Sequence, residues 1–272
     1  LLLKSGDAKS AYPMARYYLG YYLGRLGDAT KELSYYREAA QASPDYTFPF
    51  RLESIGVLRQ AIQRNPSDAR AHYYLGNLLY DHQPEVALKE WERSRELDPS
   101  FGMVHRNLAI AYEQVQKDVT KAVASLETAL SRNPREPRWH YELDVLYERA
   151  GADPAKRLKR LLDNYNTVSE RDDSFSRVVL LWVLTGEYDK ALDVMSKRHF
   201  HNWEGGGGLR SAFEDAHLLR GLKAFSQGQH AQALSDFKAA LEFPKNLEAA
   251  WPYRGGRIAE IYYFNGMAHE AL

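Results

Sequence analysis

The chain has 272 residues, of which 44% are hydrophobic, and its 36 basic and 36 acidic residues leave a formal net charge of zero. This mixed charge argues against a nucleic-acid-binding protein, which would normally show a basic stripe. Without any cysteine the chain has no disulfides and no thiolate chemistry. The longest apolar run, residues 178–184, is far shorter than a membrane span. We therefore expect a cytoplasmic protein that does not enter a membrane.

The first predicted repeat lies within residues 1–44. Its first helix contains a run of tyrosines around Gly20, the pair Gly27 and Asp28 makes the turn, and the second helix carries Tyr36. Residues 45–66 interrupt the pattern, because a proline-containing extended stretch precedes a lone helix from about residue 52 to residue 64. We interpret residues 45–66 as an irregular insertion.

Residues 69–134 contain one helical-hairpin pattern written twice. In each second helix, small and large residues recur at positions i, i+4 and i+7: Ala87, Trp91 and Ser94, then Ala122, Leu126 and Ala129. The small residue admits the neighbouring backbone, and the large residue fills the space beside it. Each copy ends at a proline, which disfavours helix at the residue before it. A period of about 34 residues is typical of paired antiparallel helices that stack into a solenoid.

The pattern weakens after Pro134 but continues, so we expect tandem helix pairs over residues 67–200. Residues 201–210 depart from it, because four glycines follow one another at 205–208. Each glycine costs about 1 kcal/mol in a helix, which predicts a loop. The repeat pattern resumes over residues 211–272, where Gly221, Ala233 and Phe237 keep the small–large spacing. We expect all these segments to form one continuous solenoid.

These positions agree in register with the tetratricopeptide repeat family, which the chain resembles. The resemblance implies an all-α solenoid of helical hairpins, a right-handed superhelix with one irregular insertion, that binds a protein or peptide partner. Residues 71–80, the loop from residue 199 and residues 244–247 are also similar to the C-terminal repeat region of bacterial proteins that carry the domain DUF5107. That narrower resemblance leaves an alternative open, an accessory region of a carbohydrate-active enzyme whose catalytic domain precedes these residues. We expect this chain to be part of a longer protein and not itself an enzyme, while enzymatic activity of the full-length protein stays open.

The first helix of each pair lines the concave face of such a solenoid. The candidate groove consists of the rings and hydrogen-bond donors at its inward positions: Tyr73, Tyr74, Asn77, Arg106, Asn107 and Arg138. Rings bury area while donors fix orientation, which suits peptide binding and leaves carbohydrate open as a second ligand class. Tyr73 and Tyr74 are adjacent, so we do not expect both to serve the hairpin core. The alternative for each tyrosine is packing between repeats.

A second set of candidates precedes the four glycines: His199, His201, Trp203 and Glu204. A zinc site needs three or four ligands, and no further histidine or cysteine run completes one here, so we predict no metal and no cofactor. The favoured interpretation is a packed loop in which Phe200 and Trp203 fold back onto neighbouring helices. The alternative also presents the two histidines and Glu204 at a fixed place on the surface.

Overall fold

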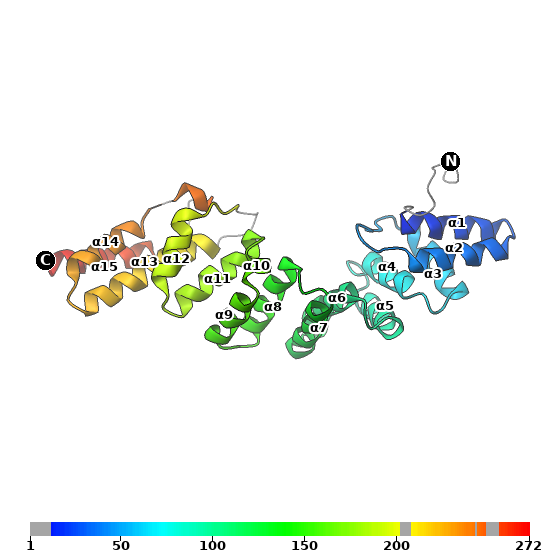
Figure 1. Ribbon diagram of the computed structural model, residues 1–272, viewed down its shortest axis with the longest axis horizontal. Coiled ribbons are helices and arrows are strands. Elements are labelled where there is room, and N and C mark those ends of the chain that lie inside the picture. Colours follow the sequence, from blue (N-terminus) through cyan, green and yellow to red (C-terminus); the bar gives the residue numbers. More distant parts are fainter. Residues whose placement is uncertain (1–11, 202–207, 243, 249–255) are drawn as a thin grey trace. The chain divides into compact units, whose positions relative to one another are not determined.

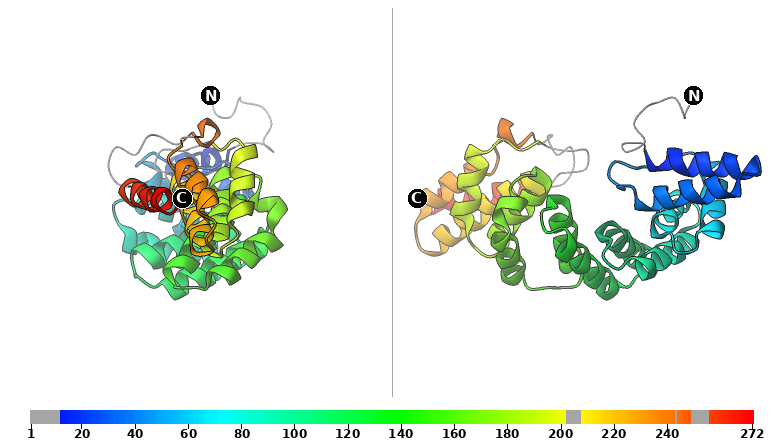
Figure 2. Two further views of the ribbon diagram at one scale, coloured as in Figure 1. Left: turned by 90° about the vertical axis from the view of Figure 1, so that its left-hand side faces the viewer. Right: turned by 45° about the vertical axis from the view of Figure 1, so that its right-hand side comes forward.

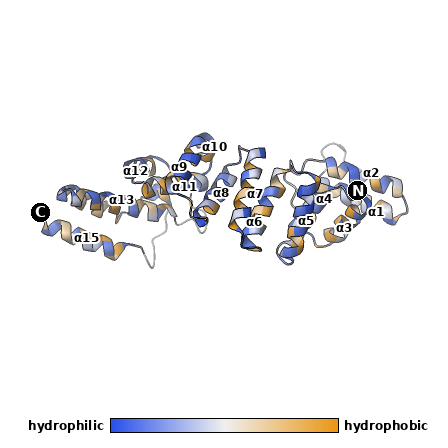
Figure 3. Cartoon of the chain, turned by 90° about the horizontal axis from the view of Figure 1, so that it is seen from below, coloured by the Kyte–Doolittle hydropathy of each residue, from blue (hydrophilic) through white to orange (hydrophobic). Residues whose placement is uncertain are grey.

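A computed structural model describes residues 12–201, 208–242, 244–248 and 256–272, and over these residues the secondary structure is helical (Figure 1). The chain divides into two compact units, Leu1–Pro134 and Arg135–Leu272. Hydrophobic and hydrophilic residues are interspersed along the helices (Figure 3), as expected for helices that bury part of their surface against neighbours. In the described part of the chain, no helix is long and apolar enough to cross a lipid bilayer.

The first unit is built from three helical hairpins and one additional helix. Its helices are α1 (Pro13–Arg25), α2 (Ala29–Gln41), α3 (Ser54–Arg64), α4 (Ala69–Leu79), α5 (Pro84–Leu97), α6 (Gly102–Gln114) and α7 (Val119–Arg132). The helices pair as α1 with α2, α4 with α5 and α6 with α7 (Figure 2). Helix α3 stands where the sequence predicts a lone helix, and it packs against α1 and α4. Helix α3 therefore connects the first hairpin to the second.

The second unit has a less regular sequence of helices. They are α8 (Pro137–Arg149), α9 (Pro154–Asp163), α10 (Tyr165–Val168), α11 (Asp172–Leu184), α12 (Tyr188–Lys197), α13 (Gly208–Ser226), α14 (His230–Ala239), the 3₁₀ helix η2 (Lys245–Leu247) and α15 (Ile258–Glu270). Gly208 and Arg210 already belong to α13, so the predicted loop over 201–210 ends earlier than the glycine run indicates. Nothing packs within 4 Å of a Cβ built on Gly208, so packing does not account for glycine at this helix start.

A glycine facing a large aromatic ring recurs in the hairpins. A Cβ on Gly20 would lie 2.6 Å from the Tyr36 ring, and one on Gly221 would lie 2.6 Å from the Phe237 ring. A Cβ on Gly76 would meet Trp91 even more closely. Each glycine thus lets the second helix bring its ring against the first helix, as the small–large spacing predicts. Trp91 and Phe237 are 3% and 0% exposed, which confirms them as core residues.

Turns and helix starts are fixed by a few local devices. Asp28, Asp68, Asp118 and Asp153 each cap a helix by accepting a hydrogen bond from the backbone N–H three residues later. Gly27 closes the α1–α2 turn with φ of 88°, a value that residues with a Cβ rarely adopt. These devices set the short connections that make neighbouring helices antiparallel.

Candidate functional site

Half-buried polar side chains from α4 and α6 meet in the first unit, and we call Asn77, Arg106 and Asn107 the asparagine cluster. Asn107 Nδ2 donates to Asn77 Oδ1 at 2.9 Å, and Arg106 Nη1 donates to Asn107 Oδ1 at 3.4 Å. Trp91 Nε1 donates to the same Asn77 oxygen at 3.0 Å and to the Tyr73 carbonyl at 3.2 Å. The buried Trp91 therefore fixes the orientation of Asn77, and Asn77 in turn holds Asn107.

The phenol of Tyr73 and the guanidinium of Arg70 extend this polar region. Burial raises the pKa of the Tyr73 phenol, while hydrogen bonds with Asn77 and Asn107 and the charges of Arg106 and Arg70 act to lower it. Arg70 lies 3.5 Å above the Phe101 ring and forms an ion pair with Asp98 at 3.4 Å. A guanidinium stacked on a ring is held in place, which makes it a fixed donor beside the cluster.

The rings of Tyr73 and Tyr74 do not line a surface, which corrects the expectation that they face a ligand. Their side chains are 3% and 0% exposed. Tyr74 packs edge-on against Tyr17 at 6.1 Å between ring centroids, whereas Tyr73 packs against Phe101 at 4.8 Å. A helix in the middle of a stack has neighbours before and after it, so two adjacent tyrosines can both be core residues.

Arg138 lies on α8 in the second unit. Its Nε donates to Glu142 Oε1 at 3.0 Å, one helical turn along the same helix, and its side chain is 61% exposed. Arg138 therefore belongs to a different unit from the asparagine cluster.

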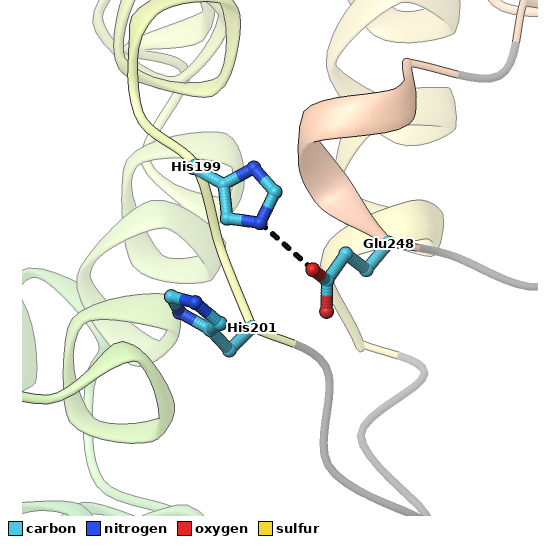
Figure 4. Close-up of side chains that lie close together, drawn as sticks. All are labelled: His199, His201 and Glu248. Atoms are coloured by element: carbon cyan, nitrogen blue, oxygen red, sulfur yellow. Dashed lines mark hydrogen bonds and ion pairs between the residues drawn. The ribbon is translucent and has the colours of Figure 1, made fainter.

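The segment after α12 carries two of the predicted loop residues. His199 Nε2 lies 2.7 Å from Glu248 Oε1, and His201 Nδ1 lies 3.0 Å from Asp172 Oδ2. The two imidazole rings are in edge-on contact at 4.9 Å between centroids (Figure 4). Trp203 and Glu204 lie outside the described residues. Glu248 could not be predicted as a neighbour of His199, because the two residues are 49 positions apart in the chain.

Phe200, between the two histidines, folds back into the core as predicted. It is 0% exposed and stacks on Phe175 at 6.2 Å, with the two ring planes 8° apart. The guanidinium of Arg198 lies over both rings. The segment is thus anchored by its central residue, while its neighbours on either side remain exposed.

A cavity of about 470 Å³ lies among α5, α6 and α7 of the first unit and was not predicted. It is lined by Glu92, Arg95, His105, Tyr112, Lys121, Ala124, Ser125 and Thr128. The Tyr112 hydroxyl donates to Glu92 at 3.1 Å and accepts from Arg95 at 2.9 Å. These three side chains therefore hydrogen-bond to one another within the cavity.

Comparison with known proteins supports the repeat assignment. Residues 2–47 and 52–87 match the model of the family described as tetratricopeptide repeat. The matched residues include α1 to α4 and the start of α5. The solved structure "YrrB: a TPR protein with an unusual peptide-binding site" is 19% identical, with a TM-score of 0.52, over 68% of this chain and 90% of that one. The structure "Naa15/Naa10 bound to HypK-THB" is 13% identical, with a TM-score of 0.53, over 96% of this chain and 34% of that one.

At these identities the solved structures show the fold alone, and they confirm the predicted all-α solenoid of tetratricopeptide type. The resemblance to DUF5107-containing proteins, the accessory role beside a carbohydrate-active enzyme and the absence of enzymatic activity stay predictions. Asn77 and Asn107 come from α4 and α6, the first helices of consecutive hairpins, and Trp91 comes from α5, the second helix of the Asn77 hairpin. The sequence pattern identified each of these residues, but it did not show that one hydrogen-bonded network joins them.

Proposed function

We propose that the first unit is a protein-interaction scaffold that binds an extended peptide segment of a partner at the asparagine cluster. The observation that carries this proposal is the fixed orientation of Asn77 and Asn107 by the buried Trp91. Side chains already held in place lose little conformational entropy when a ligand binds, so their hydrogen bonds contribute more to affinity.

The chemistry of the cluster suits a peptide backbone. An asparagine amide both donates and accepts, which matches the alternating N–H and C=O groups of an extended chain. Arg106 adds a cationic donor to the cluster, so the preferred segment carries at least one carboxylate. The YrrB structure is described as a TPR protein with an unusual peptide-binding site, and the shared fold supports the same ligand class for this chain.

The test is a selection of linear peptides from a displayed random library against the full chain, followed by fluorescence polarisation with the selected peptides. Asn107→Ala should weaken binding about fivefold, because a neutral hydrogen bond contributes about 1 kcal/mol. Arg106→Ala should weaken it by about tenfold or more, because a hydrogen bond from a charged group contributes about 1.5–3 kcal/mol. The melting temperature should stay within a few degrees, since both side chains are only half-buried.

Two exposed residues of the same types serve as matched controls. Arg135→Ala and Asn166→Ala should leave the affinity unchanged. If no linear peptide is enriched, or if the control variants weaken binding as much as the cluster variants, the proposed site is wrong. Enrichment of a glycan instead of a peptide in a parallel array would favour the alternative of a carbohydrate-linked accessory region.

A further inference from the structure

We propose that His199, His201 and Glu248 bind one divalent transition-metal ion of the Zn²⁺ class on the surface of the second unit. Each residue offers one ligand atom, and these atoms lie within 4.8 Å of one another. The inference is independent of the peptide site in the first unit. It replaces the expectation from the sequence that the loop histidines lack a third ligand.

The two histidines flank Phe200, whose ring is buried in the core. Arg198, which precedes them, is extended, with φ of −93° and ψ of 136°. Both imidazoles are exposed, and their rings are in contact at 4.9 Å between centroids, with His199 pointing toward Glu248 (Figure 4).

Glu248 is brought to the histidines by an anchored neighbour. Asn246 Nδ2 donates to the backbone carbonyls of Met195 at 2.6 Å and Arg198 at 2.8 Å, and the Phe200 N–H donates to the Asn246 carbonyl at 2.7 Å. Leu247 is 0% exposed, so the next residue emerges at a defined point beside His199. The carboxylate is thus positioned by contacts in the core rather than by chance on a free surface.

Asp172 supplies the outer contact that histidine ligands usually have. Its Oδ2 accepts from the His201 backbone N–H and faces the His201 Nδ1, both at 3.0 Å, which leaves Nε2 as the available ring nitrogen. The other carboxylate oxygen, Asp172 Oδ1, forms an ion pair with Arg198 at 2.7 Å. These contacts hold the carboxylate in place, and it in turn orients the His201 ring.

The ligand set indicates the class of metal. Two imidazoles and one carboxylate suit zinc and its neighbours, whereas Mg²⁺ and Ca²⁺ prefer oxygen ligands alone. With metal–nitrogen distances of about 2.0–2.1 Å, tetrahedral ligands stand roughly 3.4 Å apart. The widest separation of up to 4.8 Å must therefore shorten by about 1.4 Å, and the distance of 2.7 Å between His199 Nε2 and Glu248 Oε1 must lengthen. The three side chains are 54%, 71% and 41% exposed and have room for this movement. Three protein ligands leave a fourth position for water or another ligand.

The test is a Zn²⁺ titration of the untagged, chelator-treated full chain by calorimetry, in competition with a chelating dye. One ion per chain should bind, and a hundredfold excess of Mg²⁺ should not displace it. His199→Ala, His201→Ala and Glu248→Gln should each weaken binding more than tenfold. Asp172→Asn should weaken it about 10–100-fold with one ion still bound at saturation, the usual effect of losing an outer-shell partner.

The exposed His82 provides the matched control, because His82→Ala removes one histidine from elsewhere in the chain. This variant should bind Zn²⁺ like the wild type. Wild-type binding no tighter than that of the His199→Ala variant would overturn the site. Loss of binding in Glu204→Gln but not in Glu248→Gln would overturn the assignment of the carboxylate. Circular dichroism of every variant identifies any loss of affinity that comes from misfolding. Because Glu248 is exposed, Glu248→Gln should fold like the wild type, and its affinity for Zn²⁺ then decides whether the site is correct.

Discussion

The contact between Gly76 and Trp91 predicts that Gly76→Ala destabilises the wild-type protein but stabilises a Trp91→Ala variant. Gly76→Ala would place a methyl group against the Nε1 and Cδ1 atoms of the indole ring. The ring cannot turn away cheaply, because it donates two hydrogen bonds and packs against Tyr80 at 5.0 Å between centroids. Overpacking of this kind costs about 3 kcal/mol at its upper range. The gain in helix propensity returns about 1 kcal/mol, so the net loss should be about 2 kcal/mol.

In a Trp91→Ala background, the same Gly76→Ala change should stabilise the protein by about 1 kcal/mol, because the methyl group then has space. Trp91→Ala alone should cost about 3–5 kcal/mol. The coupling energy of the double-mutant cycle should therefore be about 3 kcal/mol. Urea unfolding followed by circular dichroism measures all four proteins.

Gly56→Ala is the matched control, since Gly56 lies in α3 and nothing stands within 4 Å of an added Cβ. That variant should gain about 1 kcal/mol from helix propensity alone. If Gly76→Ala is as stabilising as Gly56→Ala, the packing argument is refuted.

The remaining predictions concern buried carboxylates in the second unit. Arg157 donates to the Asp144 carboxylate at 3.1 and 2.9 Å, and the side chains of Asp144 and Arg157 are 0% and 4% exposed. Asp144→Asn removes the negative charge of this buried pair, which should lower the free energy of unfolding by about 3–5 kcal/mol, measured by urea unfolding. For Asp236, burial raises the pKa, but hydrogen bonds from His217 and Arg220 hold it below its usual value. The unfolded state then binds the proton more tightly, so this stabilisation is present above about pH 4 and is lost as the pH falls further. Melting temperatures measured from about pH 5 to pH 2.5 should fall less steeply in Asp236→Asn than in the wild type.

The local spacing of small and large residues predicted the hairpins because it reports contacts between helices adjacent in the chain. Trp91 and Phe237 could be placed in the core for that reason. The burial of both Tyr73 and Tyr74 could not be predicted in this way, because it depends on the helices that pack on each side of α4. Repeat spacing describes one hairpin at a time, and it carries no information about such doubly covered positions.

The candidate sites were predicted only as far as their residues lie on neighbouring helices. Asn77 and Asn107 lie on the first helices of consecutive hairpins, about one turn apart in register, so the sequence could place them on one face. Glu248 reaches His199 from 49 residues away in the chain. No local pattern marks such a contact, because η2 and the segment after α12 have different structures and only the folded unit brings them together.

The bonds from Asn246 to the end of α12 have a consequence for the order of folding. They join residues as much as 51 positions apart, and the helices α13 and α14 lie between them in the chain. Closing so long a loop is entropically unfavourable until the intervening chain is compact, whereas the α13–α14 hairpin is made of local contacts. We therefore expect this hairpin to form first and the link between Asn246 and the segment after α12 to form late. Slow hydrogen exchange at the Phe200 amide would then report that the whole of this region, and not only the hairpin, has reached its native arrangement.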